Sequence, residues 1–168
     1  ADALQHHAAS ELQNYLQRLF RIRADIATNP PGDSRICFHV GHADAAHIRR
    51  VVANMPDLSD QGHLVRRIDA STMVLAGGSS AAVAWAVYEL VERYGVRYLL
   101  HEDVLPRDPG PFHLPDLDLI LEPLLALRCW RQFSELATGG AMWSLAQHQA
   151  FTRQLFKLKF NSILLALW

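Results

Sequence analysis

The chain has 168 residues, of which half are hydrophobic and a fifth are charged, and its 16 basic and 17 acidic residues leave a formal net charge of -1. This composition is typical of a folded protein and leaves room for one domain of ~100–150 residues plus a remainder. Nucleic acid and membranes are not expected partners, because the chain has neither a long basic run nor the ~18–20 apolar residues that span a bilayer. The N-terminus has no signal-peptide pattern.

The first sixty residues predict two helices and one strand. Apolar residues recur at helical spacing between about residues 3 and 21, which predicts an amphipathic helix. A proline-rich break at 29–33 follows. The run 36–40 is rich in branched and aromatic residues and predicts a strand. Asp44 is expected to cap a second helix that ends near Asn54.

The central region predicts a hairpin followed by a helix. The runs 63–69 and 72–76 are separated by only two residues, which favours an antiparallel pair. Gly-Gly-Ser-Ser at 77–80 then leads into a helix that ends at about Tyr94. Gly95 stands where a left-handed C-terminal cap is expected.

The next stretch predicts short strands around a proline-rich link. Residues 96–100 indicate a strand, and 117–121 indicate an edge strand. Between them, residues 101–116 contain four prolines, so this link is expected to run over a surface without helix or central strand.

The last forty-odd residues predict one β-α-β unit: a strand at 125–133, a helix at 144–160 and a strand at 162–168. Such units build parallel sheets. The last strand is apolar without alternation, which is typical of a parallel strand buried on both faces. Left uncovered, such a strand would expose an apolar face, so we expect the natural polypeptide to be longer.

The two cysteines, Cys37 and Cys129, lie in runs that predict buried strands. Two cysteines are too few for a disulfide scaffold. Both are expected to be buried free thiols, because a free cysteine packs as a small hydrophobe.

Residues 74–80 and 87–99 resemble the N-terminal domain of family 67 α-glucuronidases and the related second domain of family 20 β-hexosaminidases. Residues 127–131 stand where these proteins have barrel strand one, and 156–163 where helix one leads into strand two. The resemblance implies an α/β (α+β) fold: a small mixed-sheet α/β sandwich, followed by the first β-α-β unit of a (β/α)8 barrel. The implied domains are an accessory domain at 1–120 and a truncated TIM barrel at 121–168.

The resemblance further implies the N-terminal part of a glycoside hydrolase that binds its carbohydrate substrate through barrel strands absent from this chain. The accessory domain would support the barrel without chemistry, and the fragment alone would be inactive. No cofactor is expected, and family resemblance favours a periplasmic or secreted location. The uncovered end of the barrel piece could also self-associate. The alternative is a stand-alone glycan- or protein-binding module whose last β-α-β unit packs on its own sheet.

No catalytic residue is assigned within the chain. Glycosidases use two carboxyl groups, and barrels place such groups at the C-terminal ends of their strands, most of which are missing here. The available acids are Glu102, Asp103, Glu122 and Glu135.

Two residues are predicted to bind substrate. An arginine on the first barrel strand of family 20 enzymes helps to hold the sugar, and Arg128 stands at that place; a structural ion pair is the alternative. A guanidinium suits sugar hydroxyls through its rigid fork of donors. Trp130, and with it Trp168, could stack on a sugar ring, although aromatic residues on barrel strands more often pack in a core.

Two local patterns have structural alternatives. Gly77-Gly78-Ser79-Ser80 could present N–H groups to an anion, but the dinucleotide and P-loop motifs are absent, which favours a tight connector with a serine cap. A second cluster could approach a metal, although ordinary surface histidines are commoner and no metal is assigned; its members are His39, His42, Asp44 and His47.

Overall fold

The computed structural model describes residues 2–28, 36–132 and 140–165. The chain divides into two compact units. The first comprises Ala1–Gly95 and Leu105–Pro123, and the second comprises Val96–Val104 and Leu124–Trp168. Within the described residues, no helix combines the length and the apolar content needed to cross a membrane.

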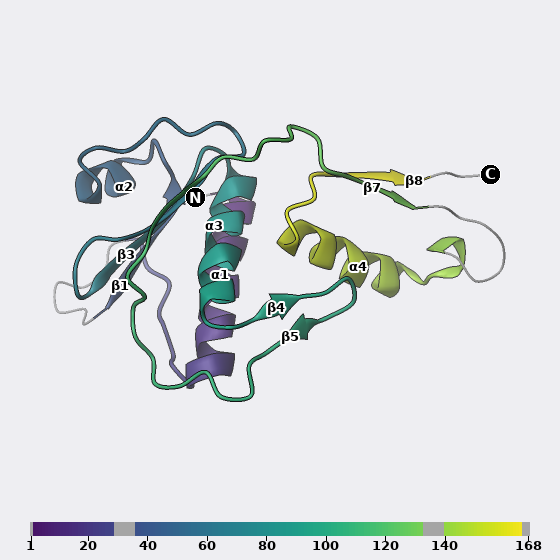
Figure 1. The fold of residues 1–168 in the computed structure, drawn as a ribbon, viewed down its shortest axis with the longest axis horizontal. Coiled ribbons are helices and arrows are strands. Elements are labelled where there is room, and N and C mark those ends of the chain that lie inside the picture. The colour runs from purple at the N-terminus through teal and green to yellow at the C-terminus, as the bar shows by residue number, and fades with distance from the viewer. Residues whose placement is uncertain (1, 29–35, 133–139, 166–168) are drawn as a thin grey trace. The chain divides into compact units, whose positions relative to one another are not determined.

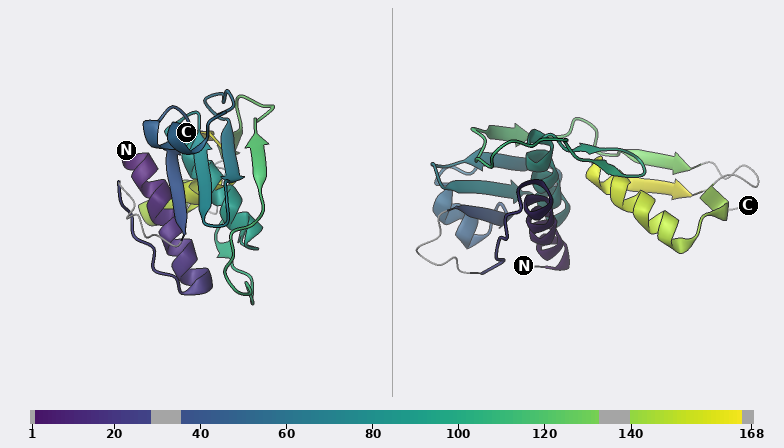
Figure 2. Two further views of the ribbon diagram at one scale, coloured as in Figure 1. Left: turned by 90° about the vertical axis from the view of Figure 1, so that its left-hand side faces the viewer. Right: turned by 90° about the horizontal axis from the view of Figure 1, so that it is seen from below.

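The first unit is built on a four-stranded mixed sheet with the strand order β1-β3-β2-β6 (Figures 1 and 2). β1 (Cys37–His42) is parallel to β3 (Thr72–Gly77), whereas β2 (His63–Arg67) is antiparallel to both β3 and β6 (Asp118–Leu121). The predicted hairpin and the predicted edge strand are therefore confirmed.

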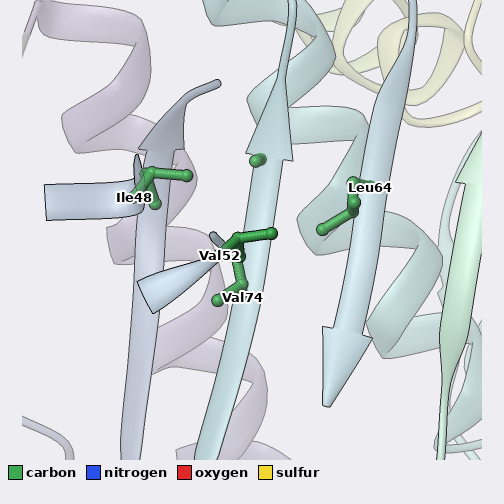
Figure 3. Packing of buried hydrophobic residues seen from close by; sticks show 5 residues of the cluster. Ile48, Val52, Leu64 and Val74 are labelled. Carbon is green, nitrogen blue, oxygen red and sulfur yellow. The ribbon is translucent and has the colours of Figure 1, made fainter. Parts of the chain in front are cut away.

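Helices cover both faces of this sheet. α1 (Ala3–Phe20) packs against α3 (Ser80–Arg93), and both contact the strands on one face. α2 (Ala46–Val51) lies on the other face, where Ile48 packs with Val52, Leu64, Val74 and Ala76 (Figure 3). The core is dense, since Ala82–Val91 of α3 are all buried.

The boundaries of α1 and α3 follow local capping chemistry. The side chain of Asp2 accepts a hydrogen bond from the Gln5 N–H at 2.8 Å, and the Ser79 hydroxyl accepts one from the Ala82 N–H at 3.3 Å. Gly95 has a φ of +92°, the left-handed conformation predicted for it, which glycine adopts without steric cost. Both helices are confirmed.

α2 differs from its prediction at both ends. It begins after Ala45, which has no side-chain cap, and it ends at Val51 rather than near residue 54. The Asp44 carboxylate instead accepts a hydrogen bond from Arg49 Nη2 at 2.5 Å. The predicted cap at Asp44 was therefore wrong, because the nearby guanidinium binds this carboxylate.

The second unit contains the predicted β-α-β unit. β7 (Cys129–Gln132) and β8 (Ser162–Leu165) form a parallel pair, and α4 (Leu145–Lys157) connects them (Figure 1). A short 3₁₀ helix at Gly140–Met142 precedes α4, whose N-terminus is held by a capping box between Ser144 and Gln147. The end of the predicted last strand, 166–168, lies outside the described residues.

A short hairpin completes the second unit. β4 (Arg97–Tyr98) pairs with β5 (Asp103–Val104) in antiparallel fashion. The strand predicted at 96–100 is thus only two residues long, because the chain turns at once toward β5.

The predicted burial of the two cysteines was wrong. Cys129 is exposed and Cys37 is only partly buried, although both are free thiols as expected. Leu164 lies in the apolar strand that was expected to expose a face unless further chain covers it, and it is 51% exposed. Within the described part of the chain, α4 covers one face of the β7–β8 pair, so side chains on the other face remain exposed.

Candidate functional site

The side chain of Trp130 defines the covered face of the β7–β8 pair. Its ring lies 5.5 Å from the ring of Phe151 on α4 and 5.8 Å from that of Phe160, in edge-to-face geometry. Phe151 also contacts Trp143 at 5.1 Å. This aromatic cluster packs α4 against the strand pair, an arrangement that adds to the energy of apolar burial.

Successive side chains of a strand point to opposite faces, so the neighbours of Trp130 lie on the side away from α4. Cys129 and Arg131 are both exposed, in agreement with that placement. Leu164, which stands opposite Arg131 in the strand register, is half exposed. We call Cys129, Arg131 and Leu164 the open face.

Arg128, predicted to bind sugar, binds the backbone at the start of the two strands. Its Nε donates to the Lys159 carbonyl oxygen at 2.6 Å and its Nη1 donates to the Leu125 carbonyl oxygen at 2.7 Å. Its own N–H donates to Asn161 Oδ1 at 2.8 Å. These contacts serve to align β7 with β8. Sugar binding by Arg128 and by Trp130 stays a prediction.

The candidate acids have separate partners. Asp103 forms an ion pair with Lys157 at 2.8 Å, and both side chains are nearly buried. Glu122 accepts hydrogen bonds from the N–H and the hydroxyl of Ser59 at 3.0 and 2.5 Å. Glu102 lies 3.3 Å from the exposed His101. Glu135 and Trp168 lie outside the described residues.

The Gly-Gly-Ser-Ser stretch is a tight connector. The Gly78 N–H donates to the Gly62 carbonyl oxygen at 2.9 Å, and Ser79 caps α3. A Cβ on Gly78 would lie 1.9 Å from the Ser59 carbonyl oxygen, so this backbone approach requires glycine. Ser80 donates to Asp2. The local geometry therefore favours the connector over an anion site.

The four residues of the predicted metal cluster have other contacts. His39 Nε2 lies 3.5 Å from Cys37 Sγ, and His47 Nε2 lies 3.4 Å from the Val40 carbonyl oxygen. His42 and Asp44 lie 3.8 Å apart. Among the residues that the structure describes, no group of three or more His, Cys, Asp or Glu side chains could hold a metal. Burial, and to a smaller degree the charge of His47, lowers the pKa of His39.

Arg131 was not singled out from the sequence. It lies near the C-terminal end of β7, the end at which barrel enzymes place their active sites. The sequence contained one usable signal, which is the alternation of side chains along a strand. Once the Trp130 side chain is assigned to the face that packs on α4, the Arg131 side chain must lie on the opposite face. The sequence alone could not make that assignment, because both faces of the strand contain large side chains.

The chain was compared with known proteins at three levels. No protein-family model matches it, and no curated protein matches it in sequence. Solved structures do match. A family GH115 4-O-methyl-α-glucuronidase with specificity for decorated arabinogalactans superposes with a TM-score of 0.69 at 15% identity, over 97% of this chain and 23% of that one. A family 89 glycoside hydrolase from Clostridium perfringens, solved in complex with PUGNAc, gives 0.53 at 12% identity, over 95% and 16%.

These matches define a class of fold. The chain has a mixed α/β fold like that of glycoside hydrolases, and it spans less than a quarter of the length of either matched enzyme. They support a glycoside hydrolase-like fold and not specifically families 67 or 20, to which the sequence resemblance pointed.

Proposed function

We propose that this chain is the N-terminal part of a glycoside hydrolase. In this proposal the first unit is a non-catalytic accessory domain, and β7, α4 and β8 begin a catalytic barrel. The substrate is a carbohydrate, bound by the barrel as a whole. The proposal rests on the likeness of nearly the whole chain to parts of two larger glycoside hydrolases.

The observation that carries the barrel assignment is the uneven burial of the second unit. Few of its described apolar side chains are buried, namely Val96, Tyr98 and Leu155. Of the thirteen large hydrophobic residues that are exposed in the described part of the chain, nine belong to the second unit: Leu99, Leu100, Val104, Leu124, Leu125, Leu127, Met142, Leu145 and Leu164. So much exposed apolar surface normally marks an interaction site. Further β/α units would cover it.

The open face fits the interior of such a barrel. In a (β/α)8 barrel the helices lie outside and the other side of each strand points inward. α4 contacts the side of β7 that contains Trp130, so Cys129, Arg131 and Leu164 would point inward. Arg131, near the C-terminal end of β7, would then be closer to the substrate than Arg128, whose side chain is bound to two carbonyl oxygens.

The polar groups of the first unit support its accessory role. Glu122 is bound to Ser59, and the Gly78 N–H of the connector is bound to the Gly62 carbonyl oxygen. The stand-alone module would instead pack its β-α-β unit on its own sheet. In the described residues, β7 and β8 form a two-stranded sheet separate from β1-β3-β2-β6.

Hydrolysis of aryl glycosides tests the proposal. The 168-residue chain and the product of the complete reading frame would be assayed on nitrophenyl glucuronide and N-acetylglucosaminide. We expect turnover by the complete product and none by the 168-residue chain. Turnover by the 168-residue chain at the same rate would contradict the assignment of chemistry to later strands. A reading frame that ends at Trp168 would contradict the barrel.

A further inference from the structure

The hairpin 96–104 belongs to a different unit from the residues on either side of it. The chain leaves the first unit after Gly95, forms β4 and β5, and rejoins the first unit at Leu105. Tyr98 pairs with Asp103 in the hairpin, and the Leu99 N–H donates to the Glu102 carbonyl oxygen at 2.9 Å to close the turn. There must therefore be a physical reason why the hairpin groups with α4, which lies about fifty residues further along the chain.

That reason is a nearly buried ion pair. Lys157 Nζ, at the end of α4, donates to both carboxylate oxygens of Asp103 at 3.0 and 2.8 Å. The two side chains are 11% and 8% exposed. Such a pair differs from a surface salt bridge, because removing one partner leaves an uncompensated buried charge.

Two further side chains surround the pair. Gln154 Nε2, one turn before Lys157, donates to Asp103 Oδ1 at 3.0 Å. This bond sets the orientation of the Gln154 amide, because the opposite orientation would place the amide oxygen against the carboxylate oxygen of Asp103, and both atoms are acceptors. The Lys157 ammonium also lies 5.7 Å from the centroid of the Tyr98 ring, in the range of a cation–π contact. Hairpin and helix thus interact through one local polar network.

We propose that the hairpin 96–104 is an anchor for α4, and that the Asp103–Lys157 pair holds it in place. The proposal goes beyond the glycosidase assignment, since it rests only on contacts within the second unit. It also gives Asp103 a structural role instead of a catalytic one. α4 in turn packs on β7 through Phe151 and Trp130, so the anchor helps to fix the strand pair.

The physical prediction is specific to a buried pair. Removing either charge alone is strongly destabilising, whereas replacing both with apolar residues of similar size is often neutral or stabilising. An exposed pair on the same hairpin supplies the matched control: His101 and Glu102 are 74% and 61% exposed, and such pairs contribute little.

Amide hydrogen exchange measured by mass spectrometry on the 168-residue chain tests the anchor. The variants are Asp103→Ala, Lys157→Met, the double variant Asp103→Leu/Lys157→Met, and the control Glu102→Gln. In each single variant we expect exchange in peptides covering 145–157 to be at least tenfold faster, with peptides covering 80–93 unchanged. The double variant should recover protection to within about threefold of the wild type, and the control should match the wild type.

Three results would overturn the proposal. The first is unchanged exchange in 145–157 when Asp103 or Lys157 is replaced. The second is equal loss of protection in 80–93, which would mean a general loss of stability. The third is a double variant in which peptides covering 145–157 exchange as fast as in the single variants. The double variant tests the proposal even if a single variant fails to fold. None of these results depends on glycosidase activity.

Discussion

Arg128 and Asn161 bind each other across the starts of two parallel strands. The Arg128 N–H donates to Asn161 Oδ1 at 2.8 Å, and the Asn161 N–H donates to the Arg128 carbonyl oxygen at 3.1 Å. Asn161 Nδ2 also donates to the Ala126 carbonyl oxygen at 2.8 Å. The asparagine side chain therefore binds the backbone on both sides of Leu127, and its own N–H binds the Arg128 carbonyl oxygen, which sets where β7 begins relative to β8.

Replacing Asn161 should weaken the second unit. Asn161→Ala removes an acceptor and a donor that bind backbone groups, and we expect the free energy of unfolding to fall by about 1–3 kcal/mol. Asn161→Asp keeps the acceptor but sets a carboxylate oxygen against the Ala126 carbonyl oxygen, so it should not recover the lost stability. Urea unfolding followed by tryptophan fluorescence measures both. Equal stability of Asn161→Ala and the wild type would contradict this role.

Replacing Arg128 separates its two possible roles. Arg128→Met removes charged hydrogen bonds to the carbonyl oxygens of Lys159 and Leu125, and should cost about 2–3 kcal/mol in urea unfolding. Arg128→Lys should recover only part of this, because an ammonium lacks the rigid fork. If instead the product of the complete reading frame keeps its stability and its KM for an aryl glycoside rises, the predicted sugar contact is the main role of Arg128.

Two glycines of the first unit should differ in their tolerance of a methyl group. A Cβ on Gly78 would lie 1.9 Å from the carbonyl oxygen of Ser59, a backbone atom, whereas one on Gly62 would lie 1.9 Å from Oε1 of the Glu122 side chain. A side chain can move aside at a smaller cost than backbone, so Gly78→Ala should lower the thermal midpoint more than Gly62→Ala. We expect a loss of about 3 kcal/mol or more for Gly78→Ala and about 1–2 kcal/mol for Gly62→Ala. The reverse order in thermal unfolding would contradict the packing of this loop.

Stability should fall on mild acidification through His39. Burial, followed by the charge of His47, lowers the pKa of His39 from the ordinary 6.5. The unfolded chain then binds this proton more readily than the folded one, so the stabilisation is present above pH 6.5 and is lost as the pH falls through the lowered pKa.

Urea midpoints between about pH 7.5 and 5.5 measure this effect. His39→Gln should make the decline shallower, because glutamine takes up no proton in this range. An unchanged pH dependence in that variant would assign the effect to other groups. Cys37 Sγ lies 3.5 Å from His39 Nε2, and burial raises the pKa of that thiol, so Cys37 stays neutral throughout this range.

The elements were predictable where local chemistry is sufficient. The helical spacing of α1, the Gly95 turn and the β2–β3 hairpin were predicted and are confirmed. The β7-α4-β8 unit was predicted for the same reason, since hydrophobic periodicity and turn residues are properties of short segments.

The contacts of the candidate site residues were less predictable, because their partners come from distant segments of the chain. Asp103 and Lys157 are 54 positions apart, and no periodicity links them. Asp44 was predicted to cap a helix, but a guanidinium five residues away binds it. The prediction of a buried Cys129 failed because the face of a strand that a helix covers is decided by packing.

The sequence by itself determined the helices, most of the strands and the parallel β-α-β unit, because side-chain periodicity and capping residues act over a few neighbours. Only the tertiary structure decided that Trp130 faces α4 while Arg131 lies on the open face, and that the hairpin 96–104 binds α4. The energies behind those outcomes come from burial and ion pairing between residues brought together by folding.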